Sequence, residues 1–149
     1  MSHSTETRVA LAVELFRTSP QFDDMEMFSA LLARGISRRL AARLIEFVPM
    51  AYCQVVLGKL GIRFSESFRR GGTQSRSRPL SSEPVWRAAC SLAASEASQG
   101  IGQQEMLLVA GRSAEFQAVN NLLKQGSKAA EITLTVPVLL WPEDGSAKS

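Results

Sequence analysis

Three arginines follow a short turn between two predicted helices. The turn reads Arg34-Gly35-Ile36-Ser37, and after it come Arg38, Arg39 and Arg43. A guanidinium group is planar and donates paired hydrogen bonds to a carboxylate or a phosphate, so these residues indicate contact with an acidic partner. We therefore take Arg38, Arg39 and Arg43 as candidate partner-binding residues.

A second group of arginines lies in a segment without regular apolar spacing. Residues 69–84 are rich in Gly, Ser and Pro, and they contain Arg69, Arg70, Arg76 and Arg78. This composition predicts a flexible basic loop, in which charge alone attracts an acidic surface or a nucleic-acid backbone. A solubilising insertion would have the same composition, so both explanations stay open.

The net positive charge is confined to the first half of the chain. Residues 1–79 contain 12 Lys and Arg and 7 Asp and Glu, a balance of +5, whereas residues 80–149 contain 5 and 7, a balance of −2. We therefore predict a non-enzymatic interaction protein, such as an adaptor, an inhibitor or an immunity-type partner, that binds an acidic protein surface. The alternative without a partner is a solvated arginine-rich face.

The two predicted helices between residues 24 and 48 indicate a second possible function. Two helices joined by a turn with glycine resemble the helix-turn-helix of nucleic-acid-binding proteins, whose second helix enters the major groove. The second helix has few side chains such as Asn or Gln that read base edges, which argues against sequence-specific binding. A nucleic-acid-binding regulator is therefore the alternative, and a purely structural helical corner is the simplest explanation.

Nucleophilic catalysis and zinc chemistry both lack their usual residues. The single histidine, His3, lies in a polar N-terminal segment, so no histidine base is expected beside a serine or cysteine nucleophile. The two cysteines, Cys53 and Cys90, lie far apart in apolar stretches and do not form a metal-binding pattern. We expect two buried thiols, no bound metal and no catalytic residue.

The densest group of carboxylates consists of Asp23, Asp24 and Glu26. At the start of a predicted helix, these side chains already serve as caps and as favourable charges for the helix dipole. An enzyme that depends on carboxylates, or on Tyr52, would need these groups to face a cleft. Such a cryptic enzyme is the third possibility.

No glycine pattern predicts a cofactor. Gly100-Ile101-Gly102 lacks the third glycine and the preceding strand of the dinucleotide-binding motif. Gly58-Lys59-Leu60 lacks the Ser or Thr that follows the lysine of a phosphate loop. Both places are explained as helix ends, and we predict no cofactor.

The elements that position these residues form a mainly α fold. The chain has 149 residues, of which 45% are hydrophobic and 21% are charged, as is typical of one globular domain. We predict a single compact domain over residues 1–149 with five to six helices. One or two short strands, at 62–68 and 132–141, are expected to pair into a minor sheet.

The sequence predicts a cytoplasmic protein without membrane contact. Its N-terminus lacks the cationic and apolar parts of a secretory signal. The apolar stretch 47–57 is shorter than the about 20 residues that span a bilayer. The oligomeric state is not predicted.

Apolar spacing and capping residues predict the first two helices. The first covers 5–18, and the second begins after Asp23, where Glu26 completes a capping box. Gly35 should end the second helix in a left-handed conformation, and Ser37 should cap the third. The expected buried face of the second helix consists of Met25, Phe28, Leu31 and Leu32.

Proline is expected to interrupt the third helix. This helix is predicted over 38–48, and Pro49 should break or kink it because proline has no amide hydrogen and disfavours helical geometry at the preceding residue. The helix should resume from Met50 to Leu60. Since this part is apolar on nearly every side, we expect it in the middle of the domain.

The second half of the chain predicts further helices. One covers 83–98 with Ser82 as its cap, a short one is favoured at 106–110, and another covers 114–125 after the cap Ser113. The inward face of the last helix should consist of Phe116, Val119, Leu122 and Leu123. Residues 143–149 are expected to fray.

Overall fold

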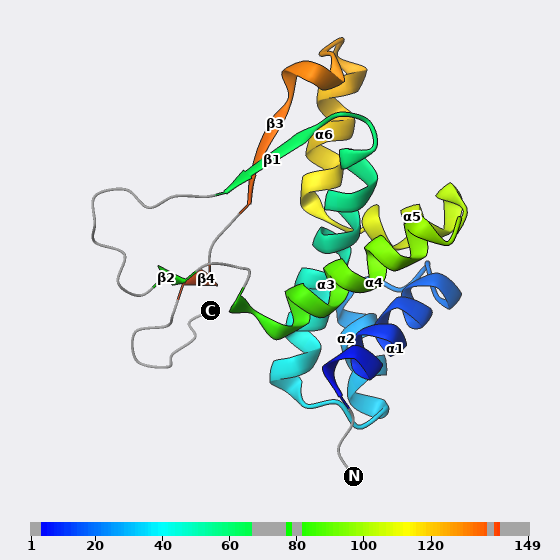
Figure 1. Ribbon diagram of the computed structural model, residues 1–149. Helices are drawn as coiled ribbons and strands as arrows, with labels where there is room; N and C mark the ends of the chain where they lie inside the picture. Colours follow the sequence, from blue (N-terminus) through cyan, green and yellow to red (C-terminus); the bar gives the residue numbers. More distant parts are fainter. Residues whose placement is uncertain (1–3, 67–76, 79–81, 137–138, 141–149) are drawn as a thin grey trace.

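One long helix, α3 (Arg38–Gly58), contacts all the other helices labelled in Figure 1. The structure is a computed structural model that describes residues 4–66, 77–78, 82–136 and 139–140. The helices that pack against α3 are α1 (Thr5–Thr18), α2 (Asp24–Ala33), α4 (Pro84–Ser98), α5 (Gln103–Ala110) and α6 (Ala114–Lys124). The described part of the chain is mainly helical and compact, which confirms the predicted class.

The central position of α3 follows from its sequence. Every residue from Phe47 to Cys53 is buried, so α3 has neighbours on all sides over this stretch. Of the predicted break or kink at Pro49, the break was wrong, because α3 continues through this residue as one helix, and the kink stays a prediction. Pro49 is itself buried, and the packing around it stabilises the helix despite one missing backbone hydrogen bond.

The length and composition of α3 would also suit a membrane span. The most apolar window of α3 has a mean hydropathy of 1.5, and 61% of this window is buried inside the structure. A helix in the core of a water-soluble protein has the same length and composition, so this feature is weak evidence for a membrane segment.

Local hydrogen bonds define the start of α2 and the start of α3 as predicted. Asp23 accepts a hydrogen bond from Glu26 N at 2.8 Å, and Glu26 accepts one from Asp23 N at 2.9 Å, which completes the capping box. Gly35 has a φ of +88°, which favours glycine, and Ser37 accepts from Leu40 N at 3.2 Å. The bounds of α1 agree with the predicted range 5–18.

The buried face of α2 differs from the prediction. Leu31 is fully buried as predicted, but Met25, expected in the core, is 75% exposed, and Met27, which was not assigned to this face, is fully buried. Phe28 and Leu32 are half-buried. Apolar residues occur on two sides of α2, and packing against α1 and α3 selects the side of Met27 and Leu31.

The helices after residue 82 agree with the prediction in type but not in every detail. The cap of α4 is Glu83 rather than Ser82, and Glu83 Oε2 accepts from Val85 N at 3.4 Å. Ser113 caps α6 by accepting from Phe116 N at 3.0 Å, as predicted. Val119 is buried as expected, but Leu122 is 39% exposed because α6 packs mainly on α3.

Two short strand pairs accompany the helices. β1 (Arg63–Glu66) pairs in parallel with β3 (Thr133–Val136), which follows a short 3-10 helix, Ala129–Glu131 (Figure 1). β2 (Ser77–Arg78) pairs in antiparallel orientation with β4 (Leu139–Leu140). The two pairs are separate in the described residues, so a minor sheet over 62–68 and 132–141 stays a prediction.

Two further predictions concern segments that are mostly not described. Of the predicted flexible loop 69–84, the structure describes residues 77–78 and 82–84. The predicted frayed tail 143–149 lies outside the described residues.

Candidate partner-binding surface

The turn between α2 and α3 is fixed by backbone hydrogen bonds and by one buried side chain. Gly35 N donates to Leu32 O at 3.0 Å, and Ile36 N donates to Leu31 O at 3.2 Å. Ile36 is only 5% exposed, so it anchors the turn in the hydrophobic core. This arrangement holds the end of α2 and the start of α3 in a defined relative position.

Three arginines are exposed at this turn, and we call Arg34, Arg38 and Arg39 the basic corner. Arg34 is the C-cap residue of α2, and Arg38 and Arg39 are the first two residues of α3. Within the described part of the chain, no carboxylate forms an ion pair with any of the three. The positive end of the α3 dipole adds to their charge.

One of these guanidinium groups rests on an aromatic ring. Arg38 Cζ lies 5.6 Å from the centroid of the half-buried Phe28 ring on α2. This cation–π contact restrains the Arg38 side chain, while the N–H groups in the plane of the guanidinium can still donate to a carboxylate. Arg38 is therefore partly oriented before any partner binds.

Arg43 has a different environment from the basic corner. Its Nε lies 3.7 Å from Glu83 Oε1, and the Glu83 side chain is 2% exposed. A buried carboxylate needs a compensating positive charge, so Arg43 has a structural role in this position. Sequence reasoning did not identify Glu83, although an acidic residue directly before Pro84 at a helix start is a signal for a cap.

No described contact places the remaining candidate arginines beside the basic corner. Arg69, Arg70 and Arg76 lie outside the described residues, as does His3. Arg78 belongs to β2, where its partner in the register is Leu139.

The acidic group at the start of α2 has structural contacts. Besides the capping box of Asp23 and Glu26, Asp24 Oδ1 lies 3.4 Å from Arg112 Nη2. Arg112 also donates to Phe22 O at 2.7 Å, and its Cζ lies 5.0 Å from the Phe16 ring centroid. These contacts connect α2 to the turn before α6. Asp23, Asp24 and Glu26 therefore each have a structural contact in this position.

Tyr52 and the two cysteines are poorly suited to chemistry at neutral pH. Tyr52 is fully buried and donates to Glu96 Oε1 at 2.9 Å, and burial together with this carboxylate raises the pKa of its hydroxyl. Burial raises the pKa of the Cys53 thiol to about 11, against a hydrogen bond from Ser113 that lowers it. Burial also raises the pKa of Cys90 to about 11, so both thiols stay protonated at neutral pH.

Metal-binding geometry is absent from the part of the chain that the structure describes. No group of three or more His, Cys, Asp or Glu side chains comes together there. Cys53 is buried, Cys90 is half-buried, and neither forms a disulfide.

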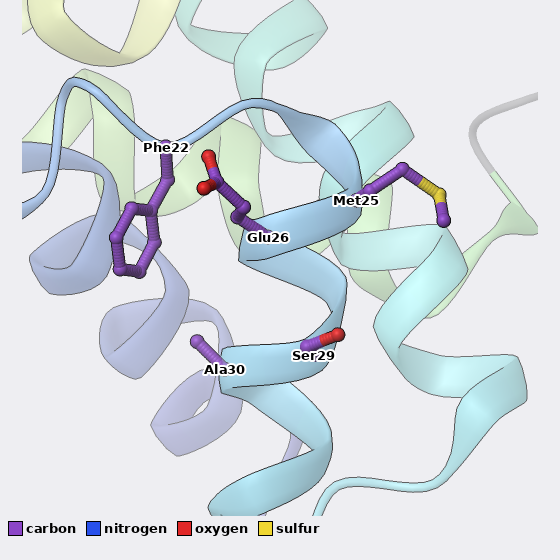
Figure 2. A pocket seen from close by; sticks show the side chains of 5 residues that line it. All are labelled: Phe22, Met25, Glu26, Ser29 and Ala30. Carbon is purple, nitrogen blue, oxygen red and sulfur yellow. The ribbon is translucent and has the colours of Figure 1, made fainter.

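A shallow depression lies on the outer side of α2, close to the basic corner in sequence. It is lined by Phe22, Met25, Glu26, Ser29 and Ala30 and has a volume of about 470 Å³ (Figure 2). Figure 2 shows Phe22 and Met25 on opposite sides of this depression, with Glu26 between them. Its lining is mixed, with two large apolar side chains, one carboxylate and one hydroxyl.

Comparison with protein-family models, with curated proteins and with solved structures found no match to this chain.

Proposed function

We propose that this chain is a non-enzymatic interaction protein that binds an acidic protein surface through the basic corner. The observation that carries the proposal is the exposure of Arg34, Arg38 and Arg39 on one rigid turn, with no ion pair to a described carboxylate. Surface arginines whose charge is not compensated are available to a partner. Because the contact with Phe28 already restrains Arg38, this side chain loses less conformational entropy when a partner binds.

The energetics of such a surface favour fast and salt-sensitive binding. An exposed ion pair contributes about 0.2–1 kcal/mol, so three arginines alone give a weak complex. Their shared charge also steers an acidic partner and raises the association rate, and salt screens this effect over a Debye length of about 10 Å. We therefore expect affinity to fall as ionic strength rises.

A nucleic acid is the second candidate partner, favoured by the geometry of the corner. Ser37 caps α3, and the exposed Arg38 and Arg39 occupy its first turn, which is the part of a recognition helix that faces DNA. No Asn or Gln occurs from Arg38 to Val48, so the arginines would supply the contacts, to phosphates or to guanine edges. The acidic protein is preferred because the stretch from Arg38 to Val48 offers no Asn or Gln that could recognise adenine.

The proposal is tested with the full chain and two variants of equal charge. The first combines R34Q, R38Q and R39Q, and the control combines K59Q, K124Q and K128Q at positions outside the basic corner. Each tagged protein is used to capture partners from native lysate at low and high salt, after circular dichroism has shown that it is folded. We expect a stoichiometric acidic protein with the wild type and the control, and its loss with the arginine variant.

Two results would overturn the proposal. One is the absence of any stoichiometric protein at low salt, and the other is equal loss of the partner in both variants. Fluorescence anisotropy with labelled duplex DNA tests the second candidate in parallel. If no binding to DNA occurs at low salt, the nucleic-acid function is excluded, because phosphate contacts are strongest under that condition.

A further inference from the structure

The outer side of α2 exposes one large apolar side chain, Met25, among polar neighbours. Met25 is 75% exposed and Ser29 is exposed, whereas Met27 and Leu31 on the opposite side are fully buried. Met25 and the partly buried Phe22 form the apolar walls of the depression in Figure 2. Because contact of a large apolar side chain with water is unfavourable, a partner that covers Met25 would stabilise the complex by burying it.

Met25 and Phe28 are neighbours on the surface of α2, because side chains three residues apart lie on adjacent turns, and Phe28 leads to the basic corner. Met25 and Phe28 are three residues apart on α2, which corresponds to a rise of about 4.5 Å along the helix. Phe28 in turn lies under the Arg38 guanidinium at 5.6 Å. The surface therefore changes from apolar to cationic within about one helical turn, and Arg34 and Arg39 extend its cationic part.

The two ends of α2 carry opposite charges. Asp23, Asp24 and Glu26 lie at its N-terminal end, whereas Arg34 and Arg38 lie beside its C-terminal end. A partner with carboxylates is repelled at the first end and attracted at the second. This polarity selects one orientation for a bound segment, since apolar burial alone has no direction.

We propose that α2 and the basic corner form a docking surface for an amphipathic linear segment of a partner protein. The segment carries a large apolar side chain, which covers Met25 in the depression, and carboxylates, which pair with Arg38 and Arg39. Because α2 is 10 residues long, the segment it accommodates is about 15 Å long. This inference rests on the proposed function and adds the chemical character of the partner.

Selection from a phage-displayed library of random peptides of about 12 residues, applied to the full chain, tests this inference. We expect the enriched peptides to combine Asp or Glu with large apolar residues. The enriched peptide with the highest affinity is then synthesised, and its dissociation constant is measured against variants of the chain.

Matched substitutions separate the two parts of the surface. M25S should weaken peptide binding by about tenfold or more, because it removes the exposed apolar side chain, while M25L should stay within about twofold of the wild type. R38Q combined with R39Q should weaken binding by about tenfold. The control L122S changes another exposed apolar residue, on α6, and should have no effect.

The remaining outcomes contradict the inference in distinguishable ways. If the arginine variant weakens binding and M25S does not, the basic corner stands and the apolar part of the surface is wrong. If neither variant weakens binding, or if the library yields no enriched acidic and apolar peptide, the docking surface is wrong, whereas the capture experiment still decides the proposed function. A dimer in sedimentation that M25S dissociates would show that a second copy of the chain covers the face instead.

Discussion

Arg17 on α1 and Glu96 on α4 form a bidentate ion pair, with Nη2 2.7 Å from Oε1 and Nη1 3.2 Å from Oε2. Tyr52 on α3 donates to the same Oε1 at 2.9 Å, and Arg17 Nε donates to the backbone oxygen of Glu105 on α5 at 3.0 Å. The contact is only partly exposed, at 18% for the Arg17 side chain and 16% for Glu96. One carboxylate and one guanidinium thus connect four helices.

Replacing the carboxylate should destabilise the fold clearly. In E96A, Arg17 and the Tyr52 hydroxyl both lose their partner in a poorly solvated place, and we expect a loss of about 2–3 kcal/mol in the free energy of unfolding. Urea denaturation followed by circular dichroism measures this. The control E14A, at an exposed position of α1, should change the free energy by less than about 0.5 kcal/mol. Equal effects of the two substitutions would show that the ion pair contributes nothing.

The single tyrosine provides a direct test of the same cluster. Burial and the Glu96 carboxylate raise the pKa of Tyr52 above the value of about 10 that it has in an unfolded chain. The unfolded state therefore releases this proton first, so Tyr52 contributes stability below about pH 10 that is lost as the pH rises further. We expect phenolate absorbance to appear only together with alkaline unfolding. Phenolate formation in the folded protein near its ordinary pKa would contradict the buried contact.

The two thiols should also resist ionisation. Burial raises the pKa of Cys53 and of Cys90 to about 11, so the stability they contribute is present below the ordinary thiol value and is lost as the pH rises through about 11. A disulfide reagent at slightly alkaline pH should react slowly with both in the folded protein, and more slowly with the fully buried Cys53. The single variants C53A and C90A assign the two rates. Rapid reaction of Cys53 without unfolding would refute its burial.

The turn at the basic corner depends on one glycine. Gly35 has a φ of +88°, and no neighbouring atom lies within 4 Å of the position that a Cβ would occupy, so G35A costs backbone strain of about 1–2 kcal/mol without a steric clash. The matched control is G58A, since Gly58 lies at the end of α3 without a positive φ and with the same open space. That change should stabilise the protein by about 0.5–1 kcal/mol, because alanine favours the helix. Thermal unfolding should therefore shift in opposite directions in the two variants, and a shift in the same direction would contradict the strained turn.

The features that sequence predicts well are those decided within a few residues. The capping box of Asp23 and Glu26, the positive φ of Gly35 and the caps Ser37 and Ser113 each depend on atoms close in sequence. Their hydrogen bonds form in any helix that begins or ends there, so the pattern is sufficient. The helical class and the position of the corner could therefore be predicted.

The features that sequence missed depend on distant partners. Arg43 is as basic as Arg38, and only the position of the buried Glu83, the cap of α4, explains why it has a structural contact. The cluster of Arg17, Tyr52 and Glu96 joins residues from three helices and leaves no local pattern. The exposed position of Arg38 and Arg39 at the turn could thus be predicted, whereas the structural contact of Arg43 could be found only from the packing of the helices.

The choice between the two apolar sides of α2 gives the sharpest comparison of sequence and structure. Spacing favoured Met25, but Met25 is 75% exposed and Met27 is fully buried. M27A should therefore cost about 2–5 kcal/mol in the free energy of unfolding, because it removes buried methylene groups and leaves a cavity. M25A makes the same chemical change on the exposed side and should cost less than about 0.5 kcal/mol. If M25A is the more destabilising of the two in urea denaturation, α2 is rotated relative to this structure, and the docking surface proposed on its outer side is lost with it.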